Sequence, residues 1–284
     1  MSKLVYSSPP YTIIHHQGIP LSAIEFLDSI AWGAEGAVYE NKNMRHHIHE
    51  LYNPSLYAIH EEDLIQGTAA FCNTIVKNGK EEVNCNYVKY FASSPEIRGK
   101  GVMKNIAHQV MKLIKENEET KTLFFACVER GNKGSYKVVE SSGYQNIGTV
   151  KTIGFSRFFP KESGFVRPVL EKEKDSIKKK LTSLYSNHAL VQFNAVFKDD
   201  QYYVYEKDGE ILAACQYHRG HWKINKMKGW SGKMILKWVP KMPLLKKIFN
   251  PSRFEFLAFE GIYLKEGHEN DLKTHFESLL HKEK

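Results

Sequence analysis

The alternation of apolar and polar positions is clearest between residues 87 and 115, where a strand pattern gives way to a helix pattern. The run Tyr87–Ala92 is rich in β-branched and aromatic residues, which favour a strand. Pro95 has no backbone N–H to donate, so the strand is predicted to end near Ser93. Beyond it, apolar residues recur at the spacing of one helix face: Val102, Met103, Ile106, Val110, Leu113 and Ile114. The pattern predicts a strand, a tight turn and an amphipathic helix.

The turn between them, Ser94 to Gly101, has the composition of an anion-binding loop. Gly99 and Gly101 remove side chains where a backbone must approach a ligand. The first amides of the following helix lack intrahelical partners and carry partial positive charge, so the helix start favours a pyrophosphate. A solvated basic turn is the alternative, because a Gly-x-Gly motif alone is weak evidence.

A second set of signals follows about thirty residues later. It consists of an apolar run at Thr122–Val128, then Asn132, a helix-like segment from Ser135 to Ser142, and Gly143-Tyr144. The ordered pair resembles the GCN5-related N-acetyltransferase (GNAT) family. That family's first motif reads Arg/Gln-x-x-Gly-x-Gly/Ala, and the chain fits it from Arg98 onward except at Met103, where a small residue is usual. Together the motifs span roughly residues 50 to 155.

The resemblance implies an α+β fold with a mixed sheet and an acetyltransferase that uses acetyl-CoA as cosubstrate. No metal is expected, because the sequence has no set of residues at metal-ligand spacing. By position, backbone groups of Phe91, Ala92 and Ser93 are expected to contact the pantetheine arm and the thioester. Asn132 is also expected to contact the coenzyme arm. The pyrophosphate is expected at the turn and the helix start, at Arg98, Gly99, Lys100, Gly101, Val102, Met103 and Lys104.

The acid and base usual in the family are both replaced in this chain. Val139 stands where a Tyr acid is expected, and Cys127 where a carboxylate base is often found. Tyr136 lies one helical turn before Val139 and is the candidate acid, with a packing aromatic as the alternative. Glu129, two residues after Cys127 on the same predicted strand face, is the candidate base. A solvated strand-end carboxylate, or a water chain as base, is the alternative.

Upstream, the pattern predicts helices over Ala23–Ala31 and 36–49, which in the family form part of the acceptor cleft. Leu56–Val76 reads as a hairpin in which Gly67 permits a bulge. Three histidines, His46, His47 and His49, have no partnering Cys or carboxylate at metal-ligand spacing, so they predict a helix surface or cleft lining.

The second half of the chain repeats part of the first. After a Pro/Gly/Ser linker at Pro160–Pro168 come a charge-dense helix start (Glu171–Lys180), a hairpin with an Asp-Gly turn (Tyr203–Cys215), a strand (Phe254–Phe259) and a helix (Glu269–His281). The turn at Lys265–Asn270 lacks paired glycines and carries carboxylates that repel a diphosphate. We therefore predict an acetyltransferase domain over 1–160 and a degenerate GNAT-like domain over 161–284. Many α+β domains share this order of elements.

Charge is concentrated in one segment, Ile211–Phe254, which has ten Lys or Arg and no Asp or Glu. Since the whole chain sums to +8, the remainder is slightly acidic. Trp222, Trp230 and Trp238 lie among these cations. The segment has three interpretations: docking on an anionic membrane surface or nucleic acid, lining a cleft for an acidic acceptor or coenzyme phosphates, or packing with solvated lysines.

Composition is that of a globular enzyme, 42% hydrophobic and 25% charged over 284 residues. The four cysteines (Cys72, Cys85, Cys127 and Cys215) are scattered without metal or disulfide spacing, which predicts reduced thiols in a cytoplasmic protein. The chain has no apolar signal core and no long apolar span. The sequence favours transfer of the acetyl group of acetyl-CoA to an amine. The alternatives are a non-catalytic acyl-CoA-binding module or a protein recruited to an anionic surface or nucleic acid through 211–254. The acceptor and the oligomeric state stay open.

Overall fold

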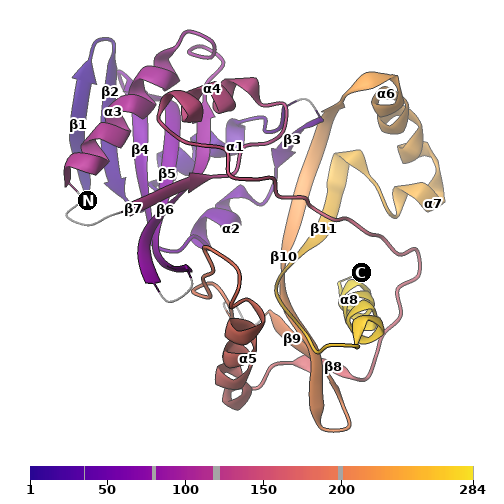
Figure 1. Ribbon diagram of the computed structural model, residues 1–284. Coiled ribbons are helices and arrows are strands. Elements are labelled where there is room, and N and C mark those ends of the chain that lie inside the picture. Colours follow the sequence, from indigo (N-terminus) through magenta and orange to yellow (C-terminus); the bar gives the residue numbers. More distant parts are fainter. Residues whose placement is uncertain (35, 79–80, 118–121, 198–200, 284) are drawn as a thin grey trace. The chain divides into compact units, whose positions relative to one another are not determined.

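The computed structural model describes residues 1–34, 36–78, 81–117, 122–197 and 201–283 (Figure 1). The chain divides into two compact units. Unit 1 holds Met1–Val76, Glu82–Thr152 and Trp222–Leu236, and unit 2 holds Lys77–Glu81, Ile153–His221 and Lys237–Lys284. The first unit therefore includes a piece of chain from the second half of the sequence.

Unit 1 is built on a six-stranded sheet in the order β1-β2-β4-β5-β6-β7. Neighbouring strands from β1 to β5 pair antiparallel, whereas β6 and β7 pair parallel, so the sheet is mixed as the sequence predicted. The register shifts opposite Gly67, where a bulge was expected. Sequence analysis had not identified the first two strands. The bounds are β1 Ser2–Ser8, β2 Tyr11–Gln17, β4 Pro54–Glu61, β5 Leu64–Asn78, β6 Glu81–Ser93 and β7 Thr122–Ala126.

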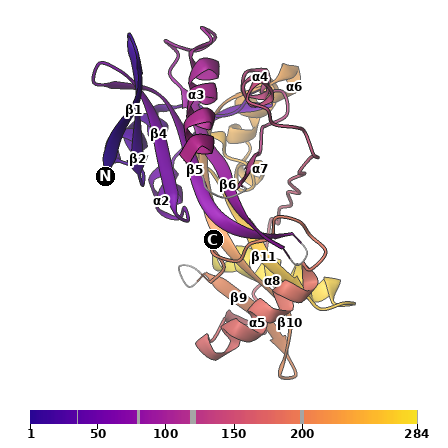
Figure 2. The same cartoon turned by 60° about the vertical axis from the view of Figure 1, so that its left-hand side comes forward.

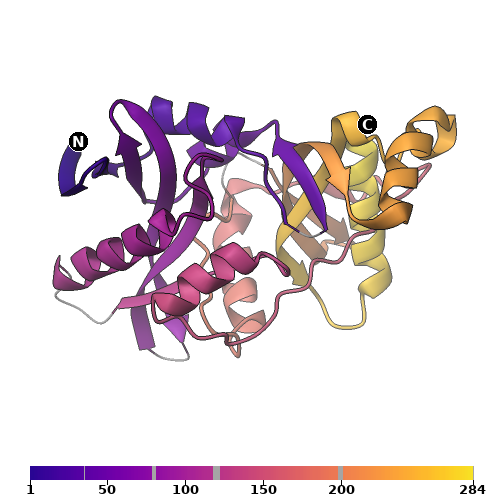
Figure 3. The same ribbon diagram turned by 90° about the horizontal axis from the view of Figure 1, so that it is seen from above.

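Helices cover both faces of this sheet (Figures 2 and 3). On one face lies α3 (Val102–Asn117), whose Ile106, Val110 and Met111 pack into a core with Ile13, Ile59 and Phe71 of the sheet. On the other face, α1 (Leu21–Ser29) and α2 (Met44–His49) enclose a second core. The helix α4 (Lys133–Ser141) packs on α3. The apolar spacing that predicted α3 is the spacing that buries it.

The expected helix over 36–49 is wrong in its first half. Residues Ala37–Asn41 form strand β3, and only Met44–His49 is helical. The strand exists because β3 pairs antiparallel with the end of β10, between Trp222 and Met227. That partner lies some 180 residues away in the sequence, so no local pattern could reveal it.

Unit 2 is built around the sheet order β11-β10-β9-β8. Its core places Ile177 and Leu181 of α5 against Tyr202, Val204 and Ala214 of the sheet. The predicted Asp-Gly hairpin is present, with φ of +52° at Asp208 and +77° at Gly209, as a tight two-residue turn requires. The elements from residue 153 onward are β8 Val166–Pro168, α5 Glu171–Leu184, β9 Tyr202–Lys207, β10 Glu210–Met227, α6 Gly229–Trp238, α7 Pro243–Lys246, β11 Phe254–Leu264 and α8 Glu269–Lys282. The end of β10 and most of α6 belong to unit 1.

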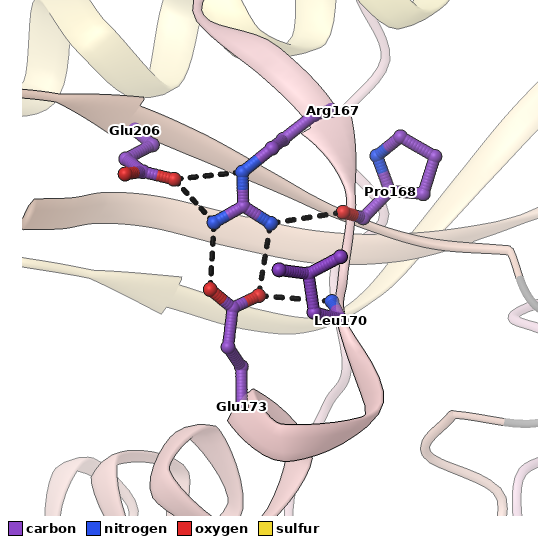
Figure 4. A network of polar contacts seen from close by, with 5 residues as sticks. All are labelled: Arg167, Pro168, Leu170, Glu173 and Glu206. Carbon is purple, nitrogen blue, oxygen red and sulfur yellow. Dashed lines mark hydrogen bonds and ion pairs between the residues drawn. The ribbon is translucent and has the colours of Figure 1, made fainter. Parts of the chain in front are cut away.

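One arginine ties three elements of unit 2 together (Figure 4). Arg167 of β8 donates to both carboxylate oxygens of Glu173 on α5, at 2.7 and 2.9 Å, and through Nε to Glu206 of β9 at 2.7 Å. Its Nη1 also donates to the Pro168 carbonyl oxygen, and Glu173 accepts from the Leu170 amide at the start of α5. The guanidinium therefore lowers the pKa of Glu173 and fixes the entry into the helix.

In the part of the chain that the structure describes, no helix is both long and apolar enough to cross a membrane. Within the same residues, no group of three or more His, Cys, Asp or Glu side chains is arranged to hold a metal ion. The four cysteines are free thiols, buried at Cys72, Cys85 and Cys215 and exposed at Cys127.

Candidate functional site

The carboxyl end of β6 has an unusual backbone. The parallel pairing of β6 with β7 stops at Val88 and Ala126, where β7 ends, but β6 continues to Ser93. Two residues past the last pair, Tyr90 has φ +48°, and its carbonyl oxygen accepts from Thr68 Oγ1 at 2.9 Å. A bulky residue in this left-handed region stores strain and kinks a strand, and such outliers cluster at functional sites. The kink directly precedes Phe91–Ser93.

Buried anchors fix the turn that follows. Ser94 is bonded twice to Gln66 of β5, by its amide at 2.8 Å and its hydroxyl at 2.5 Å. Ile97 is buried. The Arg98 guanidinium donates to the Ser93 carbonyl oxygen at 3.0 Å, which joins the turn to the end of the strand. The turn therefore has one defined shape, and the motif arginine helps to hold it.

Both glycines of the turn adopt a backbone conformation that other residues rarely adopt. Gly99 and Gly101 each have φ +80°, and no atom lies within 4 Å of where a Cβ would stand. The Gly101 carbonyl oxygen accepts from the amides of Lys104 and Asn105, so Gly101 caps α3. The amides of Val102 and Met103 precede the first intrahelical bond and carry the positive end of the helix dipole. With two exposed lysines beside it, Lys100 and Lys104, this helix start suits a diphosphate.

Gly67 of β5 explains how the turn packs against the sheet. A Cβ on Gly67 would stand 2.8 Å from Met103 Sδ, 2.8 Å from Ile59 Cδ1 and 3.1 Å from the Ala92 carbonyl oxygen. The missing side chain lets the large Met103 pack where the family usually has a small residue. This contact joins the helix start to the end of β6, and sequence reasoning had assigned Gly67 only a bulge.

The second motif builds α4 and attaches it to α3. Asn132 is the N-cap, and its Oδ1 accepts from the Ser135 amide at 3.0 Å. Gly143, with φ +89°, ends the helix. Tyr144 then packs in the α3 core, with its hydroxyl 3.8 Å from Met111 Sδ, and burial raises its pKa to about 12. These contacts are structural, and the expected contact of Asn132 with a coenzyme stays a prediction.

The two catalytic candidates lie on different elements. Tyr136 is on α4, is 46% exposed, and is absent from the core clusters of the described residues. Glu129 is exposed and lies three residues past the end of β7 at Ala126. The expectation that Glu129 continues a strand face with Cys127 is therefore wrong, because the strand ends before both. Its carboxylate lies 4.0 Å from the Cβ position of Gly36 and, after burial, is the second cause that raises the pKa of Tyr39.

Sequence reasoning missed a tyrosine beside Cys127. Tyr87 lies beside the Cys127 thiol, its ring stacks on Phe125 with centroids 4.3 Å apart, and the Lys89 ammonium lies 4.9 Å from its centroid. Burial first, and then Cys127, raise the Tyr87 pKa, so the phenol keeps its proton. The sequence alone carries no signal for this contact, because it depends on the parallel register that pairs Tyr87 with Phe125, two residues before Cys127.

The basic segment 211–254 also supplies part of unit 1. Trp222 stacks on Tyr39, with ring centroids 4.0 Å apart and an interplanar angle of 16°. Glu40 accepts from Lys42 at 2.5 Å, from Asn225 at 2.9 Å and from Lys223 at 3.3 Å. These bonds, the one from Lys42 first, lower the Glu40 pKa to about 2. The end of β10 is thus a regular, paired strand of the N-terminal unit, and it brings an aromatic ring to the neighbourhood of Glu129.

Comparison with known families agrees with this geometry. Residues 24–144 match the family described as "Acetyltransferase (GNAT) family". Residues 24–144 form a GNAT-family domain. The matched GNAT segment contains the kinked strand, the glycine turn and both ends of α4, so every coenzyme residue expected from the sequence lies inside it. No curated protein sequence matches the chain.

Solved structures extend the fold assignment to the second half. The crystal structure of Saccharomyces cerevisiae N-myristoyltransferase with bound myristoyl-CoA superposes with a TM-score of 0.59 at 8% identity, covering 99% of this chain and 76% of that chain. Glucosamine-6-phosphate N-acetyltransferase from Arabidopsis thaliana gives a TM-score of 0.33 at 18% identity, covering 52% and 99%, which is too low for an argument about the fold. The full-length likeness supports a second, GNAT-like half and a tandem GNAT architecture.

Proposed function

We propose that this chain transfers an acetyl group from acetyl-CoA to an amine acceptor. The observation that carries the proposal is the continuous feature from residue 89 to 104. There β6 runs past its neighbour, kinks at Tyr90 and turns through two positive-φ glycines into the start of α3. The proposal assigns the pantetheine arm and thioester to Phe91, Ala92, Ser93 and Asn132. It assigns the pyrophosphate to Arg98, Gly99, Lys100, Gly101, Val102, Met103 and Lys104.

The chemistry is direct attack of a neutral amine on the thioester carbonyl carbon. The C–N bond forms, the C–S bond breaks, and coenzyme A leaves as a thiolate. A backbone amide at the end of β6 stabilises negative charge on the carbonyl oxygen without any side chain. Glu129, or a water held by it, takes the proton that the amine loses. A phenol returns a proton to the thiolate, and the candidates are Tyr136 on α4 and Tyr87 on β6.

Tyr87 is added to the candidates on the strength of its surroundings. Its raised pKa keeps the hydroxyl protonated at neutral pH, as a general acid requires, and the cation of Lys89 lies beside its ring. Tyr136 is the more exposed of the two, on a helix whose N-cap is the motif asparagine. The stacked pair Tyr39 and Trp222, near Glu129, is the proposed wall of the acceptor site.

A second candidate function is a non-catalytic acyl-CoA-binding module. Val139 and Cys127 occupy the positions where the family's usual acid and base are expected, and this favours binding without turnover. The acyl chain is a separate question, because the full-length structural match is to a protein crystallised with myristoyl-CoA. A test must therefore vary the acyl chain as well as the acceptor.

The test has two steps. Calorimetric titration with acetyl-, butyryl-, octanoyl- and myristoyl-CoA measures binding, and thiol release across amines, amino acids and peptides then measures turnover. We expect acetyl-CoA to bind and to be consumed with at least one amine. Binding without thiol release would establish the binding module, and no binding would overturn both functions. Tighter binding and faster turnover of a longer acyl-CoA would replace acetyl transfer with acyl transfer.

Matched variants assign the roles. Glu129→Gln, Tyr136→Phe and Tyr87→Phe each remove one ionisable group with little change in shape. Loss of a general acid or base lowers kcat about 100-fold or more while coenzyme affinity stays constant. Tyr52→Phe, at a half-exposed tyrosine in a loop before β4, is the control and should be silent. If all three variants keep wild-type turnover, the assignments are wrong.

A further inference from the structure

The segment from Lys226 to Lys247, here called the α6–α7 segment, has a surface that the proposed function does not use. It begins with the last two residues of β10 and continues through α6 and α7 (Figure 1). Within α6, Trp230, Met234 and Trp238 are spaced at i, i+4 and i+8, so they share one helix face. All three are exposed, and Trp230 is 77% exposed. The boundary between the two units falls within α6, but this face is a property of that one helix.

Further exposed apolar residues follow the helix directly in the sequence. Pro240 and Pro243 stand at the starts of the two short helices that follow α6, and Met242, Leu244 and Leu245 are exposed there. Six large apolar side chains are therefore exposed within sixteen consecutive residues. Exposed apolar residues on soluble proteins are usually scattered singly, and a concentration of them marks an interaction surface.

The same segment is strongly cationic. Seven lysines lie within it, all exposed: Lys226, Lys228, Lys233, Lys237, Lys241, Lys246 and Lys247. No Asp or Glu occurs anywhere from residue 211 to 254. The ammonium groups of Lys237 and Lys241 lie 5.9 and 5.4 Å from the Trp238 ring centroid, so cations and apolar rings share one surface. The partner must therefore be apolar and negatively charged at once.

We propose that the α6–α7 segment docks the protein on an anionic phospholipid membrane. Tryptophan, methionine and leucine side chains enter the boundary between headgroups and acyl chains, while the lysines reach the phosphates. Nucleic acid would complement the lysines and stack on the tryptophans but would leave Met242, Leu244 and Leu245 without a partner. The association is peripheral, since α6 has ten residues and a helix needs about 20 to span a bilayer.

The experiment is co-sedimentation of the full chain with vesicles. One set is phosphatidylcholine alone, and the other is an equimolar mixture with phosphatidylglycerol. We expect binding to the anionic vesicles at least about tenfold stronger than to the neutral ones, weakening as salt increases, with a blue shift of tryptophan fluorescence. Equal binding to both vesicles, or no binding to either, would overturn the proposal.

Two double variants separate the apolar and electrostatic contributions. Trp230→Ser with Trp238→Ser should weaken vesicle binding about tenfold, and Lys237→Glu with Lys241→Glu should weaken it by a similar factor. Leu64→Ser, at an exposed leucine of β5, and Lys178→Glu with Lys179→Glu, at exposed lysines of α5, are the matched controls and should bind as wild type. Circular dichroism checks that each variant is folded.

Nucleic acid is the competing outcome of the same experiment. If duplex DNA binds the chain and displaces it from the vesicles, and if the tryptophan variants bind vesicles like wild type, the surface recognises phosphates alone and the proposal fails. If vesicle binding requires both the tryptophans and the lysines, the proposal stands. Acetyl-CoA affinity measured on the same variants should stay unchanged, since none of these residues lies in the proposed coenzyme site.

Discussion

His275 on α8 offers a quantitative test of how unit 2 is stabilised. Its side chain is fully buried, and neither ring nitrogen has a hydrogen-bond partner among the residues that the structure describes. Burial lowers its pKa from 6.5 to about 3, because the charged imidazolium has no water to solvate it. The folded protein therefore holds a neutral histidine at pH values where the unfolded chain would bind a proton.

The sign and size of the effect follow from this difference. A folded pKa below the unfolded one gives stability that is complete above pH 6.5 and declines as the pH falls from 6.5 to about 3. At about 1.4 kcal/mol per pH unit, the loss is about 2 kcal/mol at pH 5 and about 3 kcal/mol at pH 4. His275→Leu removes the group and should remove this loss. At neutral pH the variant should match or exceed wild type, since an unpartnered buried polar group costs about 1–3 kcal/mol.

The assay is differential scanning calorimetry of wild type and variant from pH 7.5 down to pH 4. The difference in Tm between variant and wild type should be about 4–8 °C larger at pH 5 than at pH 7.5, in favour of the variant. Burial also lowers the pKa of three other histidines, His15, His16 and His60. Their contributions to the pH dependence of stability are the same in both proteins and cancel in the comparison. His108→Leu, at an exposed histidine of α3, is the control. Parallel pH profiles of wild type and His275→Leu would refute the reasoning.

Three further predictions concern the proposed coenzyme site and the stability of the two units. Gly101→Ala should weaken acetyl-CoA binding, because a side chain at φ +80° strains the backbone by about 1–2 kcal/mol. Gly101→Asp should abolish binding, because it adds a negative charge beside the pyrophosphate. If calorimetry shows that the Asp variant keeps its affinity, the pyrophosphate assignment is excluded. Gly67→Ala should displace Met103, because the new methyl group would lie against its sulfur. The variant should lose about 1–3 kcal/mol of stability and also coenzyme affinity. An unchanged urea midpoint together with unchanged affinity would contradict this prediction. Arg167→Met should lower the free energy of unfolding by about 2 kcal/mol above pH 4.5. The difference from wild type should shrink in acid, as Glu173 becomes protonated. Denaturation of both proteins at pH 7 and pH 3 measures the two differences.

The local elements of the proposed coenzyme site could be predicted because their signals are local. Pro95 cannot donate a hydrogen bond to a neighbouring strand, which predicts the end of the strand before it. Two glycines two residues apart permit the positive φ that the turn adopts. The spacing from Val102 to Ile114 predicts the buried face of α3. The Asp-Gly hairpin of unit 2 was predicted for the same reason, since its turn geometry depends on the two residues that form it.

The catalytic candidates show where such reasoning fails. Glu129 was assigned to a strand face because the apolar run continues to Val128, but β7 ends at Ala126 where its pairing with β6 ends. Tyr87 could not be recognised as the partner of Cys127, because that contact depends on the register of two strands about forty residues apart. The kink at Tyr90 carries no sequence signal, since a tyrosine is an unfavourable residue for positive φ.

By itself, the sequence determined the GNAT motifs, their order, the mixed α+β class and the concentration of positive charge in 211–254, since each depends on neighbouring residues. Only the tertiary structure decided that β3 is a strand, that the end of β10 joins the N-terminal unit, and that the α6–α7 segment exposes its tryptophans. The physical reason is that strand pairing and burial are set by partners distant in the chain. The same run of apolar and basic residues can pair in a sheet at Trp222 and lie exposed at Trp230.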